Sequence, residues 1–297
     1  MLRLVFSVAL GLLVSVSYGQ LKKFYSLKGC SGYDTVNFSL EASAGNCLVK
    51  SANQEYGPLN IYGNPDLEKV NPSFKANISN NTCKVNLALQ EFKSTSLSEG
   101  ILFAMLGGAE EETNNYWKIL FDTDMVYKLD LNYGFGNADV DLSDTRVKNL
   151  KIRSGSADVL VDYSSRQPNP IAMDTFLVKV DMGSLIARNV DCTNAEHVIA
   201  NIGFGKAVLD FSKSMEKKCN VKASVGAGNL DVYLPKSDVP VIIHIKDSPF
   251  CGMKLVPGFE QVEKNVFVNM GYSASAPNLL TFDLDVAMGN VAFHYAD

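Results

Sequence analysis

Apolar and polar residues alternate along most of this chain with a period of two, not with the period of 3.6 that marks a helix. Clear examples are Asp34–Leu40, Cys83–Leu89 and Val126–Asn132, where every second residue is apolar over most of the segment. The best candidate for an amphipathic helix, Glu110–Trp117, is short and acidic. The alternation predicts strands that bury one face, so we expect a chain that is almost all β.

A short phrase recurs in these strands, each time a glycine followed by alternating apolar residues. Its copies begin at Gly136, Gly155, Gly205, Gly228 and Gly289. With a weaker copy at Gly183, the spacing from Gly136 to Gly228 is 19 to 28 residues, which suits one coil of a β-solenoid. We therefore predict an all-β fold, a single-stranded β-solenoid of parallel, β-helix-like stacked coils, with these glycines at the coil corners.

Two stretches depart from this regularity. The interval of 61 positions from Gly228 to Gly289 is expected to hold further coils without the glycine, including Val239–Ile245 and Val262–Val268. The segment Thr95–Asn115 has neither alternation nor matching turns, and we expect an inserted loop or short helix packed on the coils, with a binding lid as the alternative.

The N-terminus has the features of a secretory signal peptide. A basic residue, Arg3, precedes the apolar run Leu4–Val16, and Ser17 and Gly19 supply small residues for a cleavage site. The longest later apolar run, Ile101–Leu106, is far too short to span a bilayer. We expect residues 1–19 to be a signal peptide, residues 20–297 to form the solenoid domain, and the mature chain to have no transmembrane segment and to reside in the periplasm, at the cell surface or outside the cell.

Six cysteines remain after the predicted cleavage, an even number that permits up to three disulfides among 15 pairings. We expect Cys47 to lie in the core and leave open whether it is bridged. There is no Cys-x-x-Cys or Cys/His cluster, so we predict no metal and no cofactor. The mild balance of 27 basic and 32 acidic residues gives no electrostatic signal for nucleic acid.

Alternation also predicts an acidic stripe on the outside of the coils. Carboxylates of adjacent coils would lie about 4.8 Å apart, close enough to share calcium, although we favour a solvated face that discourages edge pairing. We expect Lys148, Lys151 and Arg153, in the intervening strand, to neutralise part of this stripe. Its candidate members are Asp139, Asp141, Asp158, Asp162, Asp210 and Asp231.

Motifs for chemistry are scarce. The Gly-x-Gly pairs at Gly134, Gly203 and Gly226 lack the third glycine and the helix of a dinucleotide site, so we interpret them as corners. His244 and His294 alternate with apolar neighbours and are expected at the strand surface. We assign no catalytic residue.

The segment from Trp117 to Tyr163 carries a family resemblance. Its two consecutive phrases, Tyr127–Leu142 and Val147–Val159, resemble the toast-rack domain and are similar to the β-solenoid portion of LiaF-like cell-envelope stress proteins and to head domains of auto-transporter adhesins of Bacteroidetes. The resemblance covers residues 117–235. It implies a bacterial β-solenoid of toast-rack type without known enzymatic activity, and it transfers no site residue.

We expect an exported structural or binding module of the cell envelope, without catalytic activity, that recognises an unknown protein or glycan on a strand face. A rigid surface with Tyr133, Tyr163, Tyr233 and Tyr295 would serve this purpose. The alternative is a polysaccharide-active enzyme on a β-helix scaffold, which would require a groove with clustered Asp, Arg and Lys.

Overall fold

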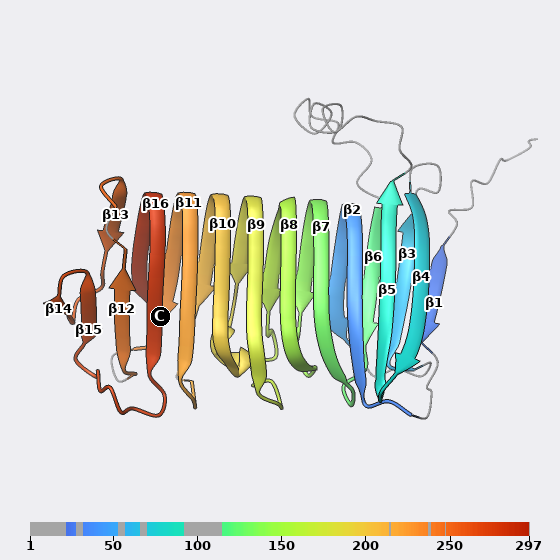
Figure 1. The fold of residues 1–297 in the computed structure, drawn as a ribbon, viewed down its shortest axis with the longest axis horizontal. Helices are drawn as coiled ribbons and strands as arrows, with labels where there is room; N and C mark the ends of the chain where they lie inside the picture. Colours follow the sequence, from blue (N-terminus) through green and yellow to red (C-terminus); the bar gives the residue numbers. More distant parts are fainter. Residues whose placement is uncertain are drawn as a thin grey trace, which may run out of the picture.

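The computed structural model describes residues 22–27, 32–52, 57–65, 70–91, 115–213, 215–236, 239–246 and 248–296. Most of them lie in β-strands (Figure 1). The predicted signal peptide at 1–19 lies outside the described residues, as does the predicted insertion at 95–115 except for Asn115, which begins a strand.

Seven long strands form the regular part of the molecule. They run parallel and in register in the spatial order β2, β7, β8, β9, β10, β11, β16, and each bends in its middle. The first halves form one layer, here called layer A, and the second halves form layer B. Each bent strand is one rung of the stack. Their bounds are β2 (Thr35–Ser51), β7 (Val126–Asp141), β8 (Arg146–Asp162), β9 (Met173–Ala187), β10 (Ala195–Asp210), β11 (Cys219–Leu234) and β16 (Leu280–Tyr295).

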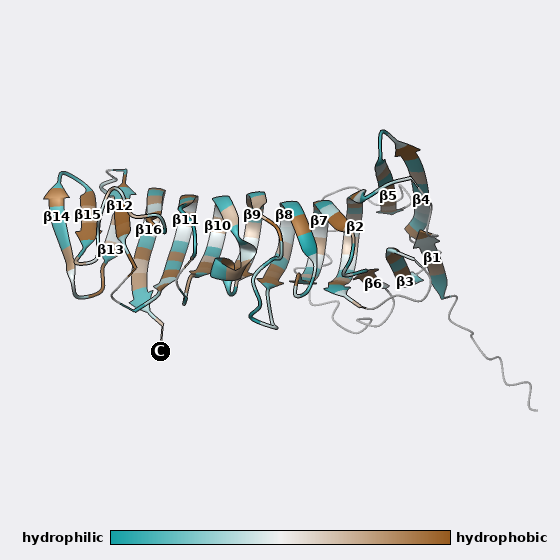
Figure 2. Ribbon diagram, turned by 90° about the horizontal axis from the view of Figure 1, so that it is seen from below, coloured by the Kyte–Doolittle hydropathy of each residue, from teal (hydrophilic) through white to brown (hydrophobic). Residues whose placement is uncertain are grey.

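The core lies between the two layers. Apolar residues at alternate positions of every rung point inward and stack on the same positions of the next rung, as with Leu131 on Ile152. Figure 2 shows the resulting alternation of polar and apolar residues along the strands. Complete burial of each large aliphatic side chain contributes roughly 1.5–3 kcal/mol, so a long column of them supports a fold with hardly any helix. The predicted all-β solenoid is confirmed.

A row of glycines marks the corner at which a rung passes from layer A to layer B. Their φ angles lie between 110° and 153°, a region that residues with a Cβ rarely adopt. A Cβ on Gly228 would also overlap the carbonyl oxygen of Gly205 in the next rung, so the rungs stack this closely only where the corner has no side chain. The row consists of Gly45, Gly136, Gly183, Gly205, Gly228 and Gly289.

One predicted corner glycine lies elsewhere. Gly136 pairs with Ala157, not with Gly155, so β8 is the rung without a glycine in this row. Gly155 lies two residues earlier, where an added Cβ would come 3.1 Å from the carbonyl oxygen of Gly134. The predicted alignment was wrong because a shift of two residues leaves every side chain on the same face, and alternation alone cannot detect it.

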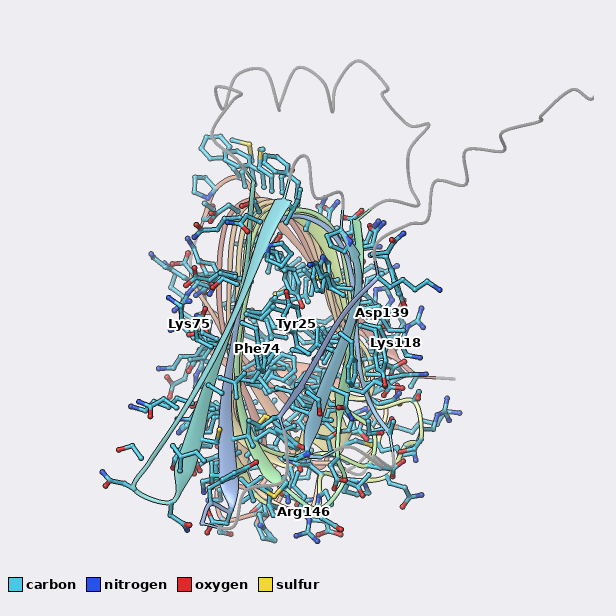
Figure 3. The ribbon with its side chains drawn as sticks, turned by 90° about the vertical axis from the view of Figure 1, so that its right-hand side faces the viewer. Tyr25, Phe74, Lys75, Lys118, Asp139 and Arg146 are labelled. Atoms are coloured by element: carbon cyan, nitrogen blue, oxygen red, sulfur yellow. The ribbon has the colours of Figure 1, made fainter. Side chains whose placement is uncertain are left out.

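The rung next to β2 at the N-terminal end is split. Its layer A half is β5 (Thr82–Glu91) and its layer B half is β6 (Asn115–Phe121), and both pair with β2. In the sequence the two halves are separated by residues 92–114, which lie outside the described residues. Beyond this rung, β4 (Val70–Ser79) extends layer A, while β3 (Leu59–Pro65) and β1 (Lys23–Leu27) extend layer B. Seen from this end, Phe74 and Tyr25 lie between the layers, with ring centroids 5.1 Å apart (Figure 3).

The C-terminal end is split in the same way. β12 (Val241–Ile245) pairs with the first half of β16 and β13 (Cys251–Lys254) with its second half. β14 (Phe259–Glu263) and β15 (Val266–Asn269) then form an antiparallel pair on β12. The prediction of further coils here was wrong in part, because only β12 and β13 continue the stack. The chain then returns to insert β16 between β11 and β12.

Two buried asparagines secure the turns at which chains enter the rungs. The side-chain amide of Asn169 accepts a hydrogen bond from the Val147 N–H at 3.2 Å and donates to the Val147 carbonyl at 2.7 Å. Asn269 accepts from the Val241 N–H at 2.9 Å and donates to the Val239 carbonyl at 2.7 Å. Each side-chain amide thus makes the two hydrogen bonds that a neighbouring strand would otherwise make, and it satisfies buried backbone N–H and carbonyl groups.

The described residues contain one short helix, η1 (Val190–Thr193), and no helix with the length and apolar character needed to cross a membrane. Cys47, Cys192, Cys219 and Cys251 are free thiols, and Cys47 is buried in the core as predicted, with 3% of its surface exposed. Burial raises the pKa of the Cys47 thiol to about 12. This keeps the thiol protonated and unreactive at neutral pH.

Candidate functional site

A groove of about 570 Å³ crosses the outside of layer A at its N-terminal end, and we call it the lysine–asparagine groove. It runs over β4, β5, β2, β7 and β8. The sequence indicated no site here, because its residues come from five strands and span positions 37 to 151 of the chain. Its polar walls are formed by Lys75, Lys84, Lys128 and Lys151, by Asn37, Asn77, Asn86 and Asn149, and by Ser39 and Asp130.

Strand register brings these side chains together. Asn37 of β2 pairs with Lys84 of β5 on one side and with Lys128 of β7 on the other. The antiparallel partner β4 places Asn77 opposite Lys84 and Lys75 opposite Asn86. All lie at outward positions of alternating strands, and Lys75 points away from the core in Figure 3. The lysines are therefore held on a rigid sheet.

The groove is positively charged although the whole chain carries a net charge of −5. Four lysines line it against a single carboxylate, that of Asp130. Asp130 is already engaged, since Arg153 Nη1 lies 3.0 Å and Lys151 Nζ 3.8 Å from its oxygens. Lys75, Lys84 and Lys128 are exposed and form no ion pair within the described residues. An anion in the groove would relieve their mutual repulsion.

Asn37 adds an unsatisfied acceptor to this site. Its Oδ1 atom is buried and has no hydrogen-bond partner among the described residues. A buried polar atom without a partner costs about 1–3 kcal/mol, a cost that a hydroxyl donor on a ligand would remove. The groove therefore combines ammonium groups for an acid with an acceptor for a hydroxyl.

The six predicted aspartates lie on the opposite layer, facing outward on layer B. They fall into three register rows and not into one continuous stripe, and β9 interrupts two of these rows with Ser184 and Ile186. The first row contains Asp158, which pairs with Asn137. The second row contains Asp139 and Asp231, which are separated by three rungs. The third row contains Asp141, which pairs with Asp162, and also Asp210, which pairs with Tyr233.

The surroundings set the aspartate pKa values in opposite directions. Burial, together with the charges of Asp141 and Asp162, raises the pKa of Asp139, and Arg188 opposes this only in part. Burial would also raise the pKa of Asp141, but hydrogen bonds from Ser143 and Ser164 outweigh it and lower the pKa below its ordinary value. Ser143 Oγ donates to Asp141 Oδ1 at 2.6 Å. Asp141 therefore anchors the turns that follow β7 and β8.

At Asp231, burial is again outweighed, here by hydrogen bonds from His294 and Lys206, and the pKa is lowered. His294 Nε2 lies 3.0 Å and Lys206 Nζ 3.2 Å from its carboxylate oxygens. Both partners come from neighbouring rungs, so the carboxylate ties three rungs together. Within the described residues no cluster of His, Cys, Asp or Glu could hold a metal ion.

The basic residues expected to neutralise the aspartates have other partners. Lys151 and Arg153 lie in layer A and pair with Asp130, and Lys148 lies 3.0 Å from Asp174. The prediction failed because it treated β8 as one straight strand, whereas the bend puts these side chains and Asp158 on different layers.

The predicted aromatic surface is only partly present. Tyr133 and Tyr163 point into the core and are 4% and 1% exposed, so their assignment to the surface was wrong. Tyr233 is 36% exposed and lies against His294, with ring centroids 4.9 Å apart.

A second groove, of about 450 Å³, lies on layer A near the C-terminal end. Asp283 and Asp285 line it at alternate positions of β16. His244 Nδ1 lies 2.9 Å from Asp283 Oδ1, and Lys246 Nζ lies 2.9 Å from Asp285 Oδ2. Both carboxylates thus have side-chain partners, and the Asp283 and Asp285 side chains are 46% and 49% exposed.

Comparison with solved structures gives distant similarities. A proposed cell adhesion protein from Clostridium sporogenes ATCC 15579 is 15% identical with a TM-score of 0.44, covering 93% of this chain and 99% of that one. A proposed adhesin from Bacteroides fragilis NCTC 9343 is 12% identical with a TM-score of 0.40, covering 93% and 98%. A proposed adhesin from Parabacteroides merdae ATCC 43184 is 11% identical with a TM-score of 0.31, covering 93% and 96%. No curated protein matches the chain.

The family model for the N-terminal domain of toast_rack, DUF2154, matches residues 30–183, just over half of the chain. The matched part runs from the split N-terminal rungs through β7 and β8 to the corner of β9, and so includes the lysine–asparagine groove. The chain belongs to the toast-rack family.

Proposed function

We propose that this protein is an exported, non-catalytic binding module of the cell envelope that holds an acidic glycan in the lysine–asparagine groove. The observation that carries the proposal is the convergence of three lysines without ion pairs on a groove that also contains the unsatisfied Asn37 oxygen. Ammonium groups attract carboxylates or sulfates, and the Asn37 oxygen suits a sugar hydroxyl. A simple carboxylate without a hydroxyl would leave that oxygen without a donor.

The rigid sheet suits such a role. The groove residues of β2, β5 and β7 alternate with buried inward neighbours such as Phe38, Val85 and Leu129, so the stems of Lys84 and Lys128 project from a fixed frame. A preorganised surface loses little conformational entropy on binding. Export is supported by the signal-peptide pattern of residues 1–19, and we propose residues 20–297 as one solenoid domain with its insertion near 95–115. A mature chain beginning at Gln20 would support this; an intact N-terminus on the exported protein would contradict it.

Binding can be tested with immobilised polygalacturonate, with neutral dextran as the reference surface. The full-length mature protein should bind polygalacturonate but not dextran, and added salt should weaken the binding. The triple variant Lys75→Ala, Lys84→Ala, Lys128→Ala should bind at least about tenfold more weakly, since every 1.4 kcal/mol lost is a factor of ten.

A control with the same change of charge is Lys217→Ala, Lys218→Ala, Lys254→Ala, which removes exposed lysines outside the groove. It should bind like the wild type. If both triple variants bind polygalacturonate equally weakly, only net charge matters, and the lysine–asparagine groove is not the binding site.

The second candidate function is cleavage of a polysaccharide in the 450 Å³ groove near the C-terminal end, with Asp283 and Asp285 as the catalytic carboxyl groups. Glycoside hydrolysis needs one carboxylic acid that donates a proton and one carboxylate. Here both carboxylates already have side-chain partners, because Asp283 is hydrogen-bonded to His244 and Asp285 is ion-paired with Lys246. We expect no release of reducing ends from polygalacturonate; release that disappears in Asp283→Asn would establish the enzyme instead.

A further inference from the structure

The outside of layer B carries another groove, at the end where the strands leave the layer. Its volume is about 440 Å³. We call it the Tyr233 groove after its only aromatic residue. It is lined by Arg166, Asn189, Asp210, Ser212, Lys213, Tyr233, Lys236 and Ala296.

Three cations reach this groove from three different turns. Arg166 follows β8, Lys213 follows β10 and Lys236 follows β11, and each is exposed. None of them forms an ion pair within the described part of the chain. The single lining carboxylate, Asp210, accepts hydrogen bonds from the N–H and hydroxyl of Ser212. The groove thus has an excess of positive charge that the fold leaves unused.

Tyr233 provides a flat wall beside these cations. His294 stacks on one side of its ring, at an interplanar angle of 24°, and is not part of the groove. This contact fixes the ring, while register places Tyr233 beside Asp210 of β10. The electron-rich face of an aromatic ring attracts the polarised C–H groups of a sugar, and a ring held in place loses little entropy on binding.

Polar groups complete the site. The Asn189 amide donates to Asp162 Oδ1 at 2.8 Å and is held at the edge of the groove, and Ser212 and Asp210 offer further hydrogen-bonding groups. A positive site with an aromatic wall and hydrogen-bonding groups matches a sugar that carries a carboxylate or sulfate. Inorganic anions would use the cations but not the ring.

We propose that the Tyr233 groove is a second binding site for an acidic saccharide. The two grooves lie on opposite layers, the first over β4, β5 and β2 and the second at the ends of β10 and β11. If both grooves are occupied, one protein molecule bridges two glycan chains. This bridging rests on the proposed function, whereas saccharide binding in the Tyr233 groove is independent of it.

The number of sites can be measured by calorimetric titration of the full-length mature protein with trigalacturonate. The wild type should bind two molecules. The variant Tyr233→Ala, Lys213→Ala and the lysine triple variant of the other groove should each bind one, and the combination of all five substitutions should bind none. The variant Tyr233→Phe keeps the ring and should bind like the wild type within about threefold, while Tyr233→Ala alone weakens the second site at least about tenfold.

The outcomes separate the two proposals. If Tyr233→Ala, Lys213→Ala binds as the wild type does, the Tyr233 groove is refuted while the lysine–asparagine groove stands. If the lysine triple variant keeps full binding, the proposed function fails and the second site stands. Displacement of trigalacturonate by an equal concentration of sodium sulfate would also refute the saccharide site, because the ring would then contribute nothing. With long polygalacturonate, the wild type should cause turbidity and each single-groove variant should bind without causing it.

Discussion

In the seven central rungs one strand passes from layer A to layer B through a corner, whereas the rungs at both ends are broken at that corner into two strands. Each central rung has the same rows of inward apolar side chains, and most have a corner glycine at which the backbones of neighbouring rungs come close together. Beyond the split rungs the chain adds antiparallel strands such as β4 and β15 that no repeat dictates. The lysine–asparagine groove lies where these two kinds of rung meet. The regular part thus supplies a rigid frame, and the irregular end adds the residues that make a site.

The largest effect should come from filling a corner of a central rung. Gly228→Ala places a methyl group against the Gly205 carbonyl oxygen at a φ of 153°, and it should lower the free energy of unfolding by on the order of 3 kcal/mol or more. Gly155→Ala is the matched control outside the row and should cost less than about 1 kcal/mol. Urea unfolding of both variants measures the difference. Equal losses would mean that the glycine row does not set the stacking.

A smaller effect is expected at the turns that lead into the rungs. Asn169→Ala leaves the backbone N–H and carbonyl of Val147 buried without their partner, and should cost about 1–3 kcal/mol. Asn269→Ala at the C-terminal end should cost a similar amount, because Asn269 makes the same pair of contacts. Asn220→Ala, at an outward position of β11, serves as control and should change stability by less than about 0.5 kcal/mol. A loss of stability in Asn169→Ala but not in Asn269→Ala would show that only the central rungs depend on an asparagine amide at the turn.

The smallest effects concern charge, and two aspartates in the same row should respond in opposite ways. The pKa of Asp231 is lowered in the folded state, so its carboxylate stabilises the protein above the unfolded pKa near 3.9, and this stability is lost as the pH falls through the lower folded value. The pKa of Asp139 is raised, so its contribution is favourable only at low pH and is lost as the pH rises through the folded value. At pH 7, Asp231→Asn should destabilise and Asp139→Asn should stabilise, each by a few tenths of a kcal/mol because water screens both sites. Thermal unfolding between pH 3 and pH 7 measures this, and the same sign for both variants would contradict it.

Much of the regular part could be predicted from the sequence. Alternation predicted the strands β2, β5 and β7, and the glycine phrase predicted the corners of four of the rungs. The bend within each strand was not predicted, although it puts Arg153 and Asp158 of the same strand, β8, on different layers. Alternation assigns a face along a strand, but it does not say at which residue that face passes to the other layer.

The ends and the grooves could not be predicted in this way. The return of β16 between β11 and β12 depends on contacts between residues far apart in the chain, such as Gly228 with Gly289. The lysine–asparagine groove depends on the register of β5, β2 and β7, which places Lys84 and Lys128 on either side of Asn37. One usable signal was present, because Lys84 and Lys128 occupy equivalent outward positions in two predicted strands. The order of the strands was needed to bring them together.

The most direct test of this division between frame and site is hydrogen–deuterium exchange of residues 20–297 with and without polygalacturonate. We predict added protection in β4, β5 and the first half of β7, with a second protected region at the ends of β10 and β11 if the Tyr233 groove binds, and no change at β14 and β15. Protection confined to the C-terminal strands, or none at β4 and β5 under conditions where the polymer binds, would contradict the account.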